Sequence, residues 1–370
     1  MLEIAREGMR IFSRNIYVKM HGLKKYSGDD EQICRSIIDE CYDTKKNYFM
    51  ASSGNYRLFY SRDFGWCIQS LLHLGYRAEV ENTLRYALKN YSAHGKITVA
   101  INDKGHAFNF PNIYSPDSVA YLYRSLRISK SKKLIEQYRQ FLNEQLAIFE
   151  SEVIDENGMV RSKRYSGMRD HVKVKRACYD MIMACMLCDE VEKINKFIGK
   201  DSLENVLKKH DLKNNLLKHY WNGKYFIDGL DDRYCSGHVN TYPYYLDVIT
   251  DKKMLKSSIK SMMQHGLDVP LPLRYGYSKN TRFIWQEMFV SNWEKNTSWS
   301  MLGLAYIDVV SRIDVKSAKK YSKIYENSIS KNKCFIELYS GSDYYNSLFF
   351  TSDDSMLWAS MYIDLKKRLK

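Results

Sequence analysis

The feature that most constrains the fold is a helical periodicity that fills nearly the whole chain, interrupted by connections of alternating length. Apolar residues recur at the spacing of one helix face. Short links follow every second helical segment, and long links rich in aromatic residues and glycine follow the others. After an N-terminal helix at about 2–20, we expect twelve helical segments, at about 29–49, 64–74, 77–91, 117–128, 131–153, 172–192, 202–220, 239–249, 252–265, 297–312, 315–331 and 353–369.

The alternating links predict how these helices are arranged. Antiparallel pairs with short links at one end place all the long links at the other end. A helix pair cannot bury its apolar faces alone, so successive pairs must pack side by side, as an open solenoid or as a closed ring of six pairs. The long links differ from one another and no repeated consensus is visible, which favours closure. We therefore predict an all-α (α/α)6 toroid, with residues 1–370 forming a single domain because no linker rich in Pro, Gly or Ser divides the chain.

Composition narrows the classes of function. The 57 basic and 43 acidic residues give a net charge of +14. The lysines are scattered along the expected helix faces, so we expect a solvated basic surface and no nucleic-acid partner. No apolar run approaches the length of a membrane span, and the N-terminus lacks a long apolar core, so we expect a cytoplasmic protein without membrane contact. We expect a monomer or small homo-oligomer.

The eight cysteines have no framework spacing. Cys185 and Cys188 form a CxxC pair, but no partner pair occurs elsewhere, which indicates buried free thiols rather than a metal or redox centre. We therefore expect neither a metal ion nor another cofactor.

Function is expected at the end that carries the long links, because loops on a rigid scaffold hold most binding and catalytic residues. Arg62 and Asp63 come just before Trp66 at a helix start. Charged groups beside an indole ring suit a sugar, since the charges bind hydroxyl groups and the ring covers an apolar sugar face. Asp117 is either an N-terminal helix residue or an acceptor for a sugar hydroxyl. Further candidates for contact with substrate in the other long links are Asn240, Trp285, Gln286, Asn296 and Trp299.

Two carboxylates are candidates for catalysis. Asp170 ends the stretch "SGMRDH" and is either a helix N-cap or a catalytic acid, while Glu337 lies between Ile336 and Leu338 and is either a structural ion-pair partner or a catalytic group. Inverting glycoside hydrolysis uses two carboxyl groups about 6.5–9.5 Å apart, with room for a water molecule between one of them and the sugar. One carboxyl group must be protonated and the other ionised.

The order of short motifs from about residue 60 to residue 360 resembles a known group of proteins. The motifs are "SRDFGW", "YSPDSVAYLY", "SGMRDHVKVKRACYDMIM", "GHVNTYPYYL", "EKNTSWSMLG" and "FIELYSGSDYYN". They resemble segments of the (α/α)6 catalytic domains of glucoamylases and processing α-glucosidases, and above all of the amylo-α-1,6-glucosidase domain of glycogen-debranching enzymes. The resemblance implies that Asp117 binds sugar, that Asp170 is the general acid and that Glu337 is the general base.

The sequence departs from that group in two respects. Met168 and Arg169 stand where the debranching domains have Trp-Met, so a sugar-stacking ring is missing beside Asp170. Arg169 and His171 would lower the pKa of Asp170 if they faced it, which is the wrong direction for an acid. Only about 60 residues precede "SRDFGW", so we expect no accessory β-domain, which favours a small or short-chain glycoside.

The sequence therefore predicts an inverting, exo-acting glycoside hydrolase acting on α-glucosidic linkages. Two alternatives stay open. One is another (α/α)6 sugar enzyme, namely a uronyl hydrolase, an epimerase or a lyase. The other is a toroid that binds a glycan without turnover.

Overall fold

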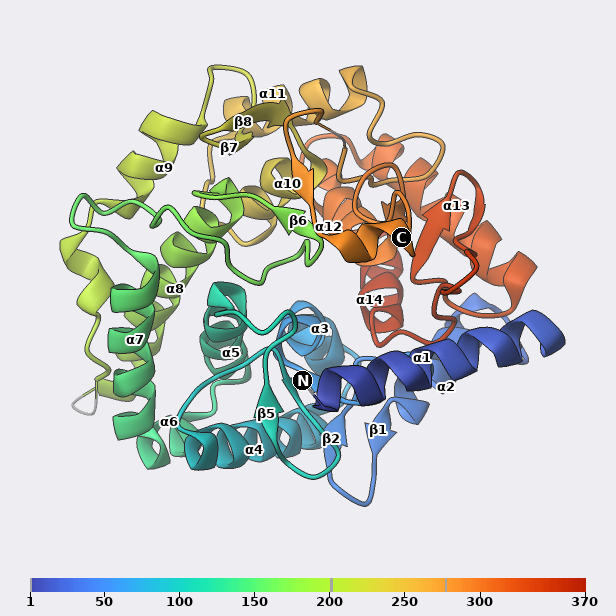
Figure 1. Cartoon of the computed structure of the whole chain (residues 1–370), viewed down its shortest axis with the longest axis horizontal. Helices are drawn as coiled ribbons and strands as arrows, with labels where there is room; N and C mark the ends of the chain where they lie inside the picture. The colour runs from blue at the N-terminus through green and yellow to red at the C-terminus, as the bar shows by residue number, and fades with distance from the viewer. Residues whose placement is uncertain (1, 200–201, 277) are drawn as a thin grey trace.

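The structure is a computed structural model that describes residues 2–199, 202–276 and 278–370. In this part of the chain the helices form two concentric rings around one axis (Figure 1). The inner ring consists of α3 (Ser61–His73), α5 (Pro116–Ser129), α8 (Cys178–Ile198), α10 (Gly237–Tyr245), α12 (Ser300–Ser311) and α14 (Ala359–Leu369). The outer ring consists of α2 (Asp30–Glu40), α4 (Arg77–His94), α6 (Lys132–Gln137) with α7 (Arg139–Val153), α9 (Leu212–Tyr220), α11 (Lys252–Gln264) and α13 (Val315–Asn332).

The ring is closed. Each inner helix packs against the next in the order α3, α5, α8, α10, α12 and α14, and α14 returns to pack against α3. Each outer helix packs against at least one inner helix, and α13 packs against both α12 and α14. The predicted all-α (α/α)6 toroid is therefore confirmed, and the open solenoid is excluded.

Local sequence signals fix several helix starts. The Asp29 side chain accepts a hydrogen bond from the backbone N–H of Gln32, and the Gln32 side chain bonds back to the backbone N–H of Asp29, so a capping box begins α2. Pro116 occupies the first turn of α5, where the missing N–H costs no hydrogen bond. Asp251 accepts from the N–H groups of Lys253 and Met254 at the start of α11.

Short strands join the long links to one another. Antiparallel pairing links β1 (Tyr42–Asp43) with β2 (Tyr48–Phe49), and β7 (Ile227–Gly229) with β8 (Asp232–Cys235). Two three-stranded sheets follow the orders β3–β4–β5 and β10–β11–β12, and β6 pairs with β9. The remaining strands are β3 (Phe59–Tyr60), β4 (Ala100–Ile101), β5 (Ala107–Phe108), β6 (Val172–Lys173), β9 (Arg282–Phe283), β10 (Ser298–Trp299), β11 (Leu338–Ser340) and β12 (Asp343–Tyr344).

Non-helical backbone shortens three of the predicted helical segments, and a fourth, 202–220, forms a 3-10 turn at Val206–Lys209 and becomes α-helix only at α9. The segment 29–49 ends as a helix at Glu40 and continues as the β1–β2 hairpin. The segment 172–192 begins as a helix only at Cys178, because Val172 and Lys173 pair with β9. The segment 353–369 begins as a helix only at Ala359, because the backbone of residues 353–355 bonds to other loops instead. In the first case a local hairpin, and in the other two pairing with distant loops, replaces the helical hydrogen bonds that periodicity alone predicts.

The centre of the ring is filled by aromatic side chains. The Trp66 ring packs edge-on against Tyr121 and Trp358, with centroids 6.0 Å and 5.8 Å away, and tilted against Tyr242 at 6.4 Å. Offset and edge-on contacts are the favoured geometry for aromatic pairs. This packing separates the end of the ring that carries the long loops from the end that carries the short links.

Helix α1 (Leu2–His21) lies outside the two rings (Figure 1) and contacts the loop before α14. Arg14 forms an ion pair with Asp354 at 2.7 Å. The Asn15 side chain donates to the carbonyl oxygen of Leu348 and accepts from the hydroxyl of Thr351. Among the described residues, no helix is both long and apolar enough to cross a membrane.

Candidate active site

Arg62 and Asp117 form a buried ion pair at the starts of α3 and α5. Arg62 Nε lies 2.6 Å from Asp117 Oδ2. The hydroxyl groups of Ser115 and Tyr179 also donate to the Asp117 carboxylate, at 2.7 Å and 3.2 Å. The carboxylates of Asp117 and Asp170 offset the burial of Arg62 and hold it in the charged form. The two predicted residues are therefore brought together, and each fixes the position of the other.

Asp170 lies at the edge of this pair. Its Oδ1 atom is 3.9 Å from Arg62 Nη1 and accepts a hydrogen bond from the hydroxyl of Ser166 at 3.3 Å. A quarter of its side chain, 25%, is exposed. Burial raises the pKa of Asp170 above its ordinary value, although the charges of Arg62 and His171 oppose the change. A partly exposed carboxyl group with a raised pKa is suited to hold and donate a proton.

The two basic neighbours of Asp170 in the sequence are occupied elsewhere. Arg169 forms a buried ion pair with Asp228 and donates to the hydroxyl of Tyr234 at 2.8 Å. His171 Nδ1 lies 3.8 Å from Glu287 Oε2. Residues 170–177 precede helix α8 (Cys178–Ile198), so a helix start does not direct these side chains. Their separation comes instead from individual partners on other loops.

Glu294 holds the backbone at Asp170. Its two carboxylate oxygens accept the successive N–H groups of Asp170 and His171, at 2.6 Å and 2.9 Å. Burial raises the pKa of Glu294 to about 7, although the neighbouring charge of His171 opposes the change. Glu294 therefore positions Asp170 through the main chain. Sequence analysis missed this residue, because one long loop contains several polar and aromatic candidates.

Glu337 lies next to β11, and only 1% of its surface is exposed. Its Oε1 atom accepts from the hydroxyl of Tyr56 at 3.0 Å, and its Oε2 atom accepts from the backbone N–H of Asp353 at 2.9 Å. Burial and the nearby Asp353 carboxylate raise the pKa of Glu337 to about 8, although both hydrogen bonds favour the ionised form. A structural ion pair does not account for this carboxyl group, since no basic group of the described residues lies within salt-bridge distance of it.

Asp63 lies next to Arg62 at the start of α3. Its Oδ1 atom accepts from the indole N–H of Trp358 at 3.0 Å. Burial raises the pKa of Asp63 to about 7, although the Arg62 charge opposes the change. Three carboxyl groups with raised pKa values, those of Asp63, Asp170 and Glu337, therefore belong to the end of the ring that carries the long loops.

The other predicted residues divide into buried and exposed ones. Trp66 and Trp299 are buried, and the Trp299 indole donates to the carbonyl of Trp293 at 2.9 Å. The Asn240 side chain bonds both backbone groups of Phe226 and so fixes the loop before α10. Asn240 therefore has a structural role, since its side-chain amide is used in these hydrogen bonds.

Trp285 and Gln286 belong to the short helix η3 (Trp285–Met288), and Asn296 lies exposed further along the same loop. Trp285 is 65% exposed, and its ring packs against Phe289. Phe289 in turn packs against Phe349, and Phe349 against Phe12 of α1. Since Ile284 donates its N–H to the carbonyl of His171, this exposed row of rings begins close to Asp170 in the fold.

Sequence analysis did not identify Tyr56, Ser166 or Tyr179 as partners of the candidate site. Each acts through one hydroxyl group, and tyrosine and serine are too common in this chain to stand out. Among the described residues, no group of three or more His, Cys, Asp or Glu side chains is arranged to hold a metal ion. All eight cysteines are free thiols, and only Cys188 is partly exposed.

No protein-family model matches the sequence, and no curated protein is similar to it in sequence. Solved structures are similar in fold. A glycosidase in complex with glucose matches with a TM-score of 0.66 and 10% identity over 98% of both chains. A rhamnosidase from Klebsiella oxytoca with rhamnose bound matches with a TM-score of 0.64 and 11% identity, and a bacterial glucoamylase complexed with acarbose with 0.63 and 14%.

The extent of these matches differs. The chain covers 65% of the rhamnosidase and 54% of the glucoamylase, while 93% and 91% of this chain is matched. The resemblance to glucoamylase-type toroids is thus confirmed for the fold.

Proposed function

We propose that the protein is an inverting, exo-acting glycoside hydrolase that cleaves α-glucosidic linkages in a small or short-chain glycoside. The observation that carries the proposal is the pair of carboxyl groups of Asp170 and Glu337, held on different loops at one end of the toroid, of which Asp170 has the raised pKa that suits an acid. The sugar-binding glycosidase neighbours in fold support the substrate class.

In the proposed reaction, Asp170 donates a proton to the oxygen of the leaving group while the glycosidic bond breaks. Glu337 accepts a proton from the water that attacks the anomeric carbon from the opposite face. Arg62, Asp63 and Asp117 bind the hydroxyl groups of the terminal sugar. The hydrogen bonds from Tyr56 and from the Asp353 N–H stabilise the ionised form of Glu337 that this role needs.

Replacing each acid in turn tests the proposal. Asp170→Asn should lose hydrolysis of a disaccharide but keep hydrolysis of α-glucosyl fluoride, because fluoride leaves without a proton. Glu337→Gln should lose both activities, since no group then activates water. Proton NMR on the wild-type reaction should show β-glucose first. Full activity of either variant on a disaccharide, or α-glucose as the first product, would contradict the assignment.

A protein that binds a glycan without turnover is the second candidate. It is favoured by the near-complete burial of Glu337, because an attacking water needs space beside that carboxyl group. Saturable binding of an oligosaccharide by calorimetry, with no product from wild type after prolonged incubation, would establish this candidate in place of hydrolysis.

A further inference from the structure

A polar cavity lies at the opposite end of the ring from Asp170 and Glu337. Its volume is about 210 Å³. Most of the residues that line it come from the C-terminal halves of α3, α5, α12 and α14 or directly follow α10 and α12, whereas the candidate active site is built at the N-terminal ends of the inner helices. Along α5, the seven residues from Asp117 to Arg124 correspond to about 10 Å. The two sites are therefore separate.

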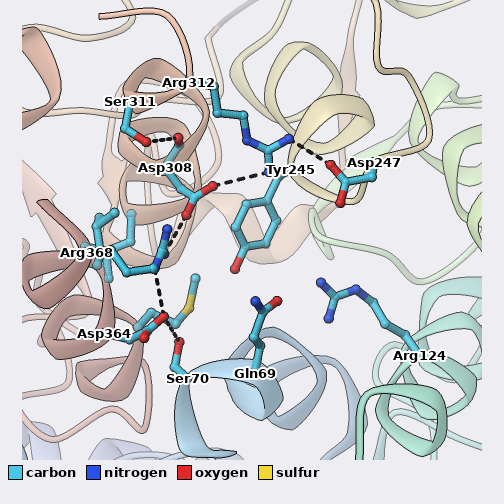
Figure 2. Close-up of a pocket in the computed structure, with 13 residues that line it drawn as sticks. Gln69, Ser70, Arg124, Tyr245, Asp247, Asp308, Ser311, Arg312, Asp364 and Arg368 are labelled. Carbon is cyan, nitrogen blue, oxygen red and sulfur yellow. Dashed lines mark hydrogen bonds and ion pairs between the residues drawn. The ribbon is translucent and has the colours of Figure 1, made fainter. Parts of the chain in front are cut away.

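The charges in this cavity are unevenly paired (Figure 2). Asp308 accepts both Arg312, at 3.3 Å, and Arg368, at 2.5 Å. Arg312 also pairs with Asp247 at 2.8 Å, and Arg368 with Asp364 at 3.2 Å. Each of the three carboxylates that line the cavity thus has an arginine partner.

Arg124 is the arginine of this cavity that has no such partner. It is only 7% exposed, and its buried Nε atom has no hydrogen-bond partner among the residues that the structure describes. Figure 2 shows its guanidinium group reaching from α5 toward Gln69 and the hydroxyl of Tyr245, with no ion pair drawn to it. A buried guanidinium group without a carboxylate is costly, because the lost hydration is not replaced. The carbonyl ends of the surrounding inner helices offset part of this cost.

We propose that this cavity binds the oxyanion of a small molecule, a carboxylate or phosphate group, through the guanidinium group of Arg124. Both oxyanions match the two-pronged donor geometry of arginine. The Tyr245 hydroxyl and the Gln69 amide, which line the same cavity as Arg124, supply further donors. The cavity does not offer a matching site for a cation, since each carboxylate that lines it already forms an ion pair with an arginine. The volume suits a ligand smaller than a drug-sized molecule.

The ligand has access from solvent. The side chains of Arg312, Arg368 and Asp247 at the rim are 35%, 45% and 62% exposed. The partial negative charge of the helix C-termini opposes an anion here, so we expect binding in the millimolar range rather than tighter.

Thermal unfolding and calorimetry test the site at constant ionic strength, with inorganic phosphate in one series and malonate in another. Wild type should show a saturable rise in melting temperature with at least one of them. Arg124→Met should weaken that binding at least tenfold, and without anion it should melt no lower than wild type, because a buried charge has been removed. The series that saturates at lower concentration identifies the preferred oxyanion.

Arg85→Met is the matched control, because it removes the same charge from an exposed pair on α4. It should bind both anions as wild type does. Arg124→Lys keeps the positive charge but lacks the two-pronged donor geometry of the guanidinium group, and it should weaken binding at least threefold. This variant tests the site even if Arg124→Met does not fold. An equal response of wild type and Arg124→Lys, or no saturable response of wild type to either anion, would overturn the proposal.

Discussion

Replacing Glu337 with glutamine should make the protein more stable, and increasingly so as the pH rises. The pKa of Glu337 is raised from 4.5 to about 8. Between these two values the folded protein holds a proton that the unfolded chain has released. The wild type therefore loses stability as the pH rises from the ordinary value of the carboxyl group to its folded value, and the penalty is complete above pH 8.

The size of the effect follows from the two values of the pKa. At 1.36 kcal/mol per pH unit, the interval from 4.5 to about 8 corresponds to about 5 kcal/mol at high pH. Most of it, roughly 3–4 kcal/mol, develops between pH 5 and pH 8. Glutamine keeps one acceptor for Tyr56 or the Asp353 N–H but leaves the other unmatched, which costs about 1 kcal/mol at every pH. The difference in the free energy of unfolding between Glu337→Gln and wild type should therefore increase with pH rather than stay constant.

Urea unfolding of both proteins at pH 5, 6, 7 and 8 measures this slope. Other titrating groups are common to both proteins and cancel in the difference. Glu81→Gln makes the same replacement in an exposed ion pair with Arg85, so a trend shared by both variants would come from overall charge. A difference between wild type and Glu337→Gln that stays flat with pH, or that favours wild type at pH 8, would refute the claim that burial controls this carboxyl group.

Three further predictions concern activity. Tyr56→Phe removes a donor that favours the ionised form of Glu337, so the pKa of Glu337 should rise by about half a unit or more. The pKa that the pH–rate profile reports for Glu337, below which this base is protonated, should move upward, and an unchanged profile would exclude this role. Glu294→Gln leaves one of the N–H groups of Asp170 and His171 without its acceptor, so kcat should fall about tenfold to a hundredfold with little change in KM. Glu294→Asp should recover part of the lost kcat. A change in KM alone would contradict a positioning role. The Trp285 side chain is 65% exposed, so Trp285→Ala should leave the melting temperature unchanged. The replacement should raise KM about threefold for oligosaccharides and not for an aryl glucoside. Equal effects on both substrates would exclude contact between Trp285 and the substrate.

The ring could be predicted from the sequence because link length and periodicity encode it directly. The starts of α8 and α14 could not, because residues 172–173 pair with a strand more than a hundred residues away. The same limit applies to the site. Arg62 and Asp117 stand out as residue types, but only the fold reveals that they form one ion pair. Arg169 lies beside Asp170 in sequence, yet its charge is taken up by Asp228, which no local pattern indicates.

The two ends of the ring show which electrostatic effect prevails. All inner helices begin at the loop end, where their N-termini favour ionised carboxylates by about 0.3–1 kcal/mol each. The pKa values of Asp63 and Glu337 are nevertheless raised, to about 7 and about 8, with burial as the leading cause. Desolvation therefore outweighs the helix dipoles at that end, and protons are held there near neutral pH. At the other end the dipoles favour cations, and three arginines gather around the cavity. The direction of the helices thus makes one end suited to proton transfer, while the other end holds the Arg124 guanidinium group, which has no carboxylate partner among the described residues.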